Sequence, residues 1–178
     1  MEGYNMAVYE LLESGHPTLS VPLTEVTNDQ EGREQIQQDL VDTMRAKNGI
    51  GLSANQIGIG ARVFAMYADV KEKDILVCFN PKIINQSEEE ILMDEGCLSY
   101  PGLWLKIRRP DGIEVEYEDE NGEKQEKAMF GLEARIFQHE YDHMEGTDFT
   151  QRVSKLKLDR AKKRLRKVQK KLDRPVLP

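Results

Sequence analysis

Apolar residues recur at the spacing of an α-helix in three parts of the chain. The first helix is expected after the capping residues Asn28 and Asp29 and should end near residues 47–49. A second is expected to begin at Gly131, and a third, basic helix covers residues 152–174 and ends before Pro175. The apolar positions are Ile36, Leu40, Val41 and Met44 in the first, Leu132 and Ile136 in the second, and Leu156, Leu165, Val168 and Leu172 in the third.

Apolar runs between the first two helices predict strands. Residues 63–67 and 75–79 are expected to be buried strands, the second ended by Asn80 and Pro81. Over residues 113–118, apolar side chains alternate with glutamates, which is typical of a half-exposed strand. Asn121–Gly122 is a hairpin-turn sequence that leads into a return strand.

The composition is that of a globular protein. The chain has 178 residues, of which 39% are hydrophobic and 32% charged, so we expect one domain over residues 1–178. No apolar run approaches the ~20 residues that span a bilayer, and no secretory leader is evident. Two cysteines are too few for a disulfide scaffold. We therefore expect a cytoplasmic protein that does not bind a membrane.

Charge is distributed unevenly. The chain has a formal net charge of -7, but residues 152–174 hold twelve basic and two acidic residues. An acidic body with a basic tail indicates an anionic partner for the tail, although many charged helices are simply solvated.

The strongest chemical signal is the string Gln-His-Glu-Tyr-Asp-His over residues 138–143. On a helix, His139 and His143 project from one face, so they can bind one metal ion. Glu140 lies beside them, placed to accept a proton from water at that ion. The pair continues an apolar stripe and should be buried, and buried imidazoles without a partner are costly.

A third ligand is needed, and several residues are candidates. Where some metalloproteases have a third histidine after the glycine, this chain has Phe149 after Gly146. His16 lies in a Gly-His-Pro turn and is expected to be an exposed loop residue. Asp148 and several glutamates leave a carboxylate possible as the third ligand. Cys97 is the better candidate because turn-forming residues surround it, whereas Cys78 lies in an apolar run and is expected in the core.

A glycine-rich stretch over residues 49–60 has a separate interpretation. Its start matches the string Gly-x-Gly-x-x-Ala of dinucleotide sites, but a helix precedes it and a strand follows, which is the wrong order. We expect instead that Gly49 and Gly51 leave the backbone open to a peptide lying alongside. Gln56 would then direct its amide toward the metal.

Three strings together resemble the peptide deformylase family. They are Gly-Ile-Gly-Leu-Ser-Ala-Asn-Gln at 49–56, Glu-Gly-Cys-Leu-Ser at 95–99 and Gln-His-Glu-Tyr-Asp-His at 138–143. They occur in the family's order, and the resemblance covers about residues 10–160. Ser53 stands where alanine is commoner in the family, a departure that we expect to leave the chemistry undisturbed.

The resemblance implies a fold, an activity and a site. The fold would be α+β, with mixed or antiparallel sheets packed around a central metal-binding helix, plus a C-terminal helix. The activity would be removal of the formyl group from N-formylmethionine of nascent peptides, with release of formate. One divalent ion per chain, Fe²⁺ natively with Zn²⁺ or Ni²⁺ as substitutes, would be held by Cys97, His139 and His143. Glu140 would be the general base, and the Gln56 amide and the Leu98 backbone N–H would be the oxyanion donors.

The resemblance also implies substrate and partner contacts. The peptide would bind as an added strand, with its backbone against Ile50, Gly51 and Gly96. Tyr100 and Trp104 follow the cysteine and are candidates for lining the cleft, although both are also candidates for ordinary core or surface aromatics. The basic C-terminal helix would dock on ribosomal RNA, since Lys and Arg bind phosphates without regard to sequence.

Two other functions compete with this one. A His-Glu-x-x-His protease that cleaves internal peptide bonds would use a carboxylate as its third ligand and would not need Cys97. A catalytically silent homologue would bind formylated peptides or ribosomes without hydrolysing them. Such a protein would not need a general base, so the presence of Glu140 and Gln56 argues against it.

Overall fold

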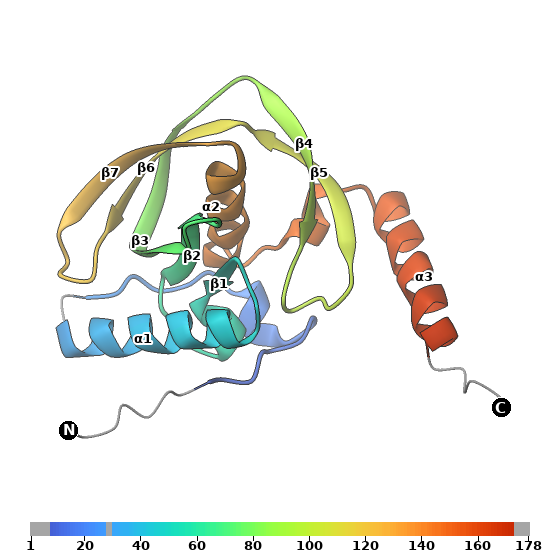
Figure 1. The fold of residues 1–178 in the computed structure, drawn as a ribbon, viewed down its shortest axis with the longest axis horizontal. Coiled ribbons are helices and arrows are strands. Elements are labelled where there is room, and N and C mark those ends of the chain that lie inside the picture. The colour runs from blue at the N-terminus through green and yellow to red at the C-terminus, as the bar shows by residue number, and fades with distance from the viewer. Residues whose placement is uncertain (1–7, 28–29, 173–178) are drawn as a thin grey trace.

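The computed structural model describes residues 8–27 and 30–172, and it has an α+β fold (Figure 1). The described helices are α1 (Gln30–Ala46), α2 (Gly131–Met144) and α3 (Lys155–Leu172). Three short 3₁₀ turns are η1 (Pro17–Ser20), η2 (Ala54–Ile57) and η3 (Phe149–Arg152). The strands are β1 (Gly51–Ser53), β2 (Val63–Asp69), β3 (Asp74–Gln86), β4 (Glu90–Gly96), β5 (Trp104–Pro110), β6 (Gly112–Glu118) and β7 (Lys124–Phe130).

The main sheet separates two helices that cover its opposite faces. Its strand order is β1-β2-β3-β6-β7, with every neighbouring pair antiparallel. Because side chains alternate along a strand, Phe64 and Met66 of β2 pack in one core with Phe137 of α2. Val63 and Ala65 face the other way, into a core that includes Leu40 and Met44 of α1. Helix α2 therefore lies inside the molecule, enclosed by the strands (Figure 1).

A two-stranded sheet, β4 paired with β5, forms the far wall of the molecule. Leu105 and Ile107 of β5 pack with Phe149 of η3 and Ala161 of α3 in a third core. Helix α3 rests on this core and otherwise stands away from the body, as Figure 1 shows. The β4–β5 hairpin contributes β5 to the third core, and it also positions the metal-ligand candidate Cys97, which directly follows β4.

Most of the expected elements are present. Helices α1 and α2 and the β6–β7 hairpin lie where the pattern predicted them. The basic helix begins at Lys155 rather than at Arg152, which belongs to η3. Its expected apolar stripe is only partly buried, since Leu165 packs in the third core but Leu156 and Val168 are exposed. The predicted caps Asn28 and Asp29 and the predicted end at 174–175 lie outside the described residues.

The predicted end of the second strand was wrong. β3 continues through Asn80 and Pro81 to Gln86. The register with β6 shifts between Phe79 and Lys82, and Asn80 has a φ of 49°. Proline is tolerated in a strand at such a bulge, where it removes no regular ladder hydrogen bond. β3 thus pairs with β2 as far as Phe79, and with β6 from Phe79 to Gln86.

Within residues 8–27 and 30–172, no helix combines the length and the hydropathy of a transmembrane segment.

Candidate metal centre

Helix α2 supplies two buried histidines to one point in the core. His139 and His143 are one helical turn apart, so their rings lie on the same face, with centroids 5.6 Å apart. Their exposed fractions are 8% and 1%. The predicted burial of both imidazoles is therefore confirmed.

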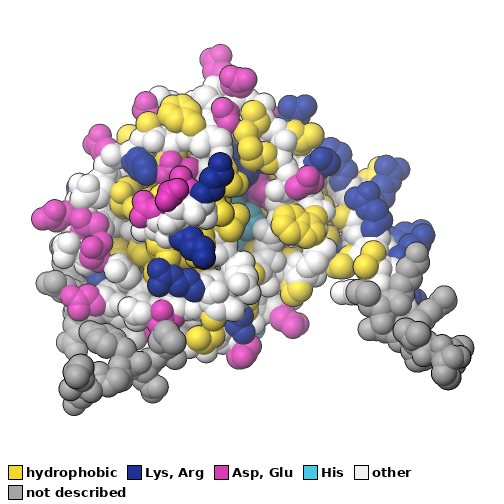
Figure 2. Space-filling view, in the orientation of Figure 1, with side chains coloured by type: hydrophobic (Ala, Val, Ile, Leu, Met, Phe, Trp, Pro, Cys, Tyr) yellow, Lys and Arg dark blue, Asp and Glu magenta, His cyan; other side chains and the backbone are white. Residues whose placement is uncertain are grey.

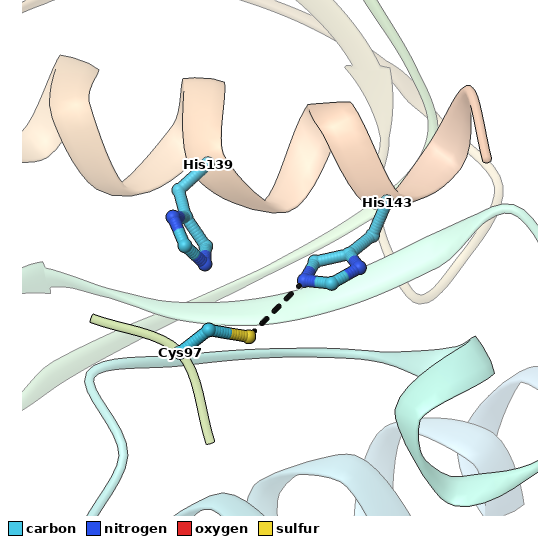
Figure 3. Close-up of side chains that lie close together, drawn as sticks. All are labelled: Cys97, His139 and His143. Carbon is cyan, nitrogen blue, oxygen red and sulfur yellow. Dashed lines mark hydrogen bonds between the residues drawn. The ribbon is translucent and has the colours of Figure 1, made fainter. Parts of the chain in front are cut away.

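Cys97 completes the cluster from the other side. Its Sγ lies 3.5 Å from Nε2 of His143. One ligand atom from each of Cys97, His139 and His143 lies within 4.8 Å of the others. Figure 3 shows both rings projecting from α2 toward the sulfur, which comes from the segment after β4. The three residues that the sequence singled out as metal ligands thus meet at one point.

The donor set fits a divalent transition-metal ion. A thiolate with two imidazoles leaves one position of a tetrahedron open, which distinguishes catalytic from structural sites. Burial, and next the neighbouring His139, lower the pKa of His143 to about 3, so its imidazole is neutral and able to bind a metal. Burial alone would lower the pKa of His139, but hydrogen bonds with Cys97 and Glu95 raise it to about 10, so a metal ion that binds this ring must displace its proton.

The other candidate ligands lie elsewhere. His16 is exposed, and its Nδ1 accepts a hydrogen bond from the backbone N–H of Thr18 at the start of η1. The Asp148 carboxylate accepts hydrogen bonds from Tyr100 and Thr150. Cys78 is fully buried in the core, as expected. The structure therefore favours the thiolate over a carboxylate as the third ligand.

Glu95 fixes the orientation of His139. Its Oε2 lies 3.0 Å from Nδ1 of His139, so the other ring nitrogen faces the cluster. The same carboxylate accepts two hydrogen bonds from Arg109, of 2.7 and 2.9 Å, and one from Arg135 of 2.7 Å. Burial alone would raise the pKa of Glu95, but His139 and the two hydrogen bonds from Arg109 hold it well below its usual range.

A second buried carboxylate extends this network toward the surface. Asp142 lies 2.9 Å from Nη1 of Arg109 and is also paired with Arg152 of η3. The side chains of Asp142 and Arg109 are 3% and 2% exposed, so each buried charge has a partner of opposite sign. A continuous chain of charged groups thus runs from the surface at Arg152 to the metal-ligand candidate His139.

A serine holds the buried side chain of Glu140 in place. Its Oε2 accepts a 2.6 Å hydrogen bond from the Ser53 hydroxyl. A Cβ at Gly51 would lie 2.4 Å from its Oε1, so β1 approaches this carboxylate as closely as glycine allows. Burial raises the pKa of Glu140 against the opposing effects of His139 and of the hydrogen bond from Ser53. Ser53, which we expected to leave the chemistry undisturbed, contacts the candidate base directly.

The Gln56 side chain points where the sequence predicted. Its Nε2 lies 3.4 Å from Sγ of Cys97 and 3.2 Å from Oγ of Ser99. Its Oε1 accepts a 2.9 Å hydrogen bond from the backbone N–H of Ser53. The amide is therefore fixed with its donor toward the metal-ligand cluster.

A cavity of about 470 Å³ opens over these groups. In Figure 2 a histidine (cyan) is visible at the bottom of the hollow. β1 is an edge strand of the main sheet, and β4 belongs to the two-stranded sheet; both border this cavity. Its lining includes the candidate residues Ile50, Gly51, Gln56, Gly96, Cys97, Leu98, Tyr100, Trp104, His139 and Glu140.

Sequence reasoning missed the groups that support the site. Glu95 and Asp142 lie inside the strings that resemble the family's motifs, so the sequence marked both residues but did not indicate what they do. Arg109 and Arg135 gave no local signal, because their partners are brought together only by the hairpin and α2. The β4–β5 hairpin itself was not predicted, since its Asp94–Gly96 segment resembles a turn.

Comparisons with known proteins agree on one family. The family model for "Polypeptide deformylase" matches residues 8–159. A peptide deformylase from Christiangramia forsetii is 36% identical, over 92% of this chain and 90% of its own length. The structure of peptide deformylase from Ehrlichia chaffeensis superimposes with a TM-score of 0.81 at 34% identity, over 93% of this chain and 98% of that one.

A further solved structure contains a peptide. It is a peptide deformylase from Acinetobacter baumannii with Met-Ala-Ser bound, and it has a TM-score of 0.78 at 29% identity, covering 83% of this chain and 99% of that one. The fold, the Cys-His-His cluster and the matches over most of the chain agree. This chain therefore belongs to the peptide deformylase family and is a metal-dependent hydrolase that removes N-terminal formyl groups.

Proposed function

We propose that Glu140 is the general base and acid of this hydrolysis. The observation that carries the assignment is its position: the carboxylate is buried and lines the same cavity as Cys97 and His139. Because burial raises its pKa, the carboxylate is a better proton acceptor than an exposed glutamate. It accepts a proton from the water that attacks the formyl carbon. It then gives that proton to the amine as the C–N bond breaks, which yields formate and a free N-terminus.

A divalent ion held by Cys97, His139 and His143 would supply Lewis acidity, which lowers the pKa of water and polarises a carbonyl. Glu95 supports this by keeping the His139 ring in one orientation through its 3.0 Å contact with Nδ1.

The Gln56 amide and the Leu98 backbone N–H stabilise the negative charge that develops on the formyl oxygen. Gln56 is suited to this because both ends of its amide are fixed, by Ser53 at Oε1 and by Ser99 at Nε2. A preoriented donor needs no reorganisation during the reaction, and loss of one such donor typically costs ~2.7–4 kcal/mol of barrier.

The formylated peptide binds as an added strand between β1 and β4. The backbones of Ile50, Gly51 and Gly96 border the cavity on these two sides. Leu132, which is 48% exposed, and Ile136 lie on the cavity wall and offer apolar surface to the methionine side chain. Tyr100 and Trp104 also line the cavity, and they contact the peptide beyond its methionine.

Formate release from formyl-Met-Ala-Ser tests these roles. Metal-loaded protein is expected to release formate, and Glu140→Ala to lose nearly all activity while keeping its metal. Glu133→Ala, on the same helix but outside the cavity, is the matched control and should retain activity. No release by properly metallated protein would overturn the assignment and favour the silent, peptide-binding homologue.

Cys97→Ser separates this mechanism from that of a carboxylate-liganded protease. We expect the bound metal to be lost or strongly weakened, since a neutral hydroxyl replaces the thiolate. Asp148→Asn should leave the metal in place. The opposite pattern, with metal retained in Cys97→Ser and lost in Asp148→Asn, would support the protease.

We further propose that Fe²⁺ is the native ion, with Zn²⁺ and Ni²⁺ as substitutes. One sulfur and two imidazole nitrogens form a donor set that all three ions accept, so availability in the cell decides among them. Metal analysis after anaerobic purification tests this proposal. Zinc alone in such a preparation, with full activity, would contradict it.

We also propose that α3 docks on ribosomal RNA. Its described lysines and arginines are exposed and form a basic surface, visible on the helix that stands off the body in Figure 2. Binding should weaken steeply with salt, because phosphate contacts release counterions. Charge reversal at Lys163, Arg166 and Lys170 should abolish ribosome co-sedimentation at low salt; unchanged co-sedimentation would contradict docking.

Finally, we propose that the protein works in the cytosol. Both cysteines are free thiols, Cys78 in the core and Cys97 at the metal-ligand cluster, which suits a reducing compartment. Fractionation of the source cells, with the enzyme assayed in each fraction, tests this placement.

A further inference from the structure

A second groove lies between α3 and the β4–β5 hairpin. It has a volume of about 900 Å³. Its apolar lining comes from Leu105 of the hairpin and from Ala161, Leu165 and Val168 of α3. Val168 is 54% exposed although it faces the groove, so part of this apolar surface is open to solvent.

This groove adjoins the active-site cavity. Asp94, Pro101, Gly102 and Trp104 line both hollows. Trp104 forms the border between them: a Cβ at Gly96 would lie 3.2 Å from its indole, so the ring covers the backbone at the end of β4. The indole is nevertheless 63% exposed, and it offers an apolar surface that leads from one hollow into the other.

The outer face of the hairpin extends the same path. Gly96 pairs with Trp104, and two residues further out Asp94 pairs with Lys106. Side chains two residues apart lie on the same face of a strand, so Trp104 and Lys106 follow one another along one surface. A peptide that left the metal-ligand cluster along β4 would therefore pass Trp104 before it reached the groove.

The groove is lined by positive charge. Lys106 lies 3.4 Å from Asp94, so these two charges offset each other. Lys157, Arg160 and Arg164 of α3 also line the groove. In the described part of the chain, none of these three has a carboxylate within ion-pair distance. The groove thus combines an apolar floor with three cations, although the whole chain has a net charge of -7.

We propose that this groove binds the part of a formylated peptide that follows its first three residues, and that it favours acidic and apolar residues there. The inference rests on the peptide orientation proposed above. Two observations select this occupant: the groove shares four lining residues with the active-site cavity, and its charge complements an acidic segment. Helix α3 then contributes to substrate selection as well as to docking.

Peptides of different length and charge test the proposal. Three substrates are compared: formyl-Met-Ala-Ser, the same tripeptide followed by six alternating aspartates and leucines, and a counterpart with lysine in place of aspartate. The acidic peptide should have a kcat/KM about three- to tenfold above that of the lysine peptide, because exposed ion pairs are individually weak. This advantage should shrink as salt rises. The net charge of the protein alone would favour the lysine peptide.

Paired variants locate the effect. The double variant Arg160→Glu and Arg164→Glu should abolish the preference for the acidic peptide and leave the tripeptide rate unchanged. The double variant Lys163→Glu and Arg166→Glu changes the net charge equally, but these residues lie outside the groove, so the preference should remain. Lys47→Glu, at a residue that lines the active-site cavity but not the groove, should also leave it intact.

The outcomes distinguish failure of the proposed function from failure of the groove as a peptide site. If the tripeptide is not deformylated, the proposed function fails. If the tripeptide reacts but the long peptides show no acidic preference, or if both α3 variants lose it equally, the groove does not bind substrate. Loss of the preference in Lys47→Glu but not in the groove variant would place the exit of the peptide near Lys47 and overturn the proposal.

Discussion

The hydroxyl of Ser53 donates a 2.6 Å hydrogen bond to Oε2 of Glu140. Both residues are buried. Ser53 belongs to β1 and Glu140 to α2, and the two residues are 87 positions apart in the sequence. The bond fixes one carboxylate oxygen and leaves Oε1 beside Gly51, at the cavity. The main sheet thus orients the proposed base.

Ser53→Ala is therefore expected to lower kcat about three- to tenfold, which corresponds to the ~0.5–1.5 kcal/mol that one hydrogen bond typically contributes. KM should change less than twofold, because Ser53 does not border the cavity. Steady-state kinetics with a formyl tripeptide and metal analysis check this. Ser20→Ala, at an exposed position, is the control. A variant with wild-type kcat would show that packing alone orients Glu140.

Gly51→Ala should impair catalysis far more than stability. The added methyl group would lie 2.4 Å from Oε1 of Glu140, so the carboxylate must move away from its position. We expect kcat to fall more than about tenfold, since even small displacements of a catalytic group are costly. Gly60→Ala is the matched control, because nothing lies within 4 Å of its added Cβ. Equal kinetics of the two variants would contradict the close approach.

Glu95→Gln should weaken both the metal site and the fold. Arg109 and Arg135 would lose a buried negative partner, and breaking a buried ion pair costs about 3–5 kcal/mol. The support of His139 would weaken as well, which typically costs about 10- to 100-fold in metal affinity. Thermal unfolding and metal titration measure the two effects.

Asp94→Asn, one residue away in β4, is the control for that variant. Asp94 is 58% exposed and its pair with Lys106 is solvated. The unfolding free energy of the Asp94→Asn protein should therefore differ from that of the wild type by less than about 1 kcal/mol. Similar losses in both variants would show that the buried network does not stabilise the fold.

The two cysteines should differ in reactivity. Burial raises the pKa of the Cys78 thiol well above its ordinary value, so it stays protonated and shielded. Iodoacetamide between pH 7 and pH 9 should leave Cys78 unmodified in the folded protein and modify it after denaturation. Cys97, which lines the cavity, should be modified after metal removal and protected by added metal. Peptide mass mapping distinguishes the two; rapid modification of Cys78 in folded protein would contradict its burial.

Local sequence patterns were sufficient for much of the fold and the site. Helix α2 and the β6–β7 hairpin follow from periodicity and from Asn121–Gly122, because both depend on neighbouring residues. His139, His143 and Glu140 share a helix, so their spacing alone predicted that the two imidazoles could bind one ion. Cys97 was harder to predict, because it lies in a distant segment and had to be chosen among several possible third ligands.

The sequence by itself determined the donor types, the helix that presents two of them, and the family. Only the tertiary structure decided which distant groups meet. It showed that β3 continues past Pro81, because a register shift accommodates the proline. It placed the Ser53 hydroxyl on Glu140 and the Glu95 carboxylate between Arg109 and Arg135. These contacts join residues far apart in the chain, and since buried charges and hydroxyls gain stability only from partners brought by packing, no local pattern specifies them.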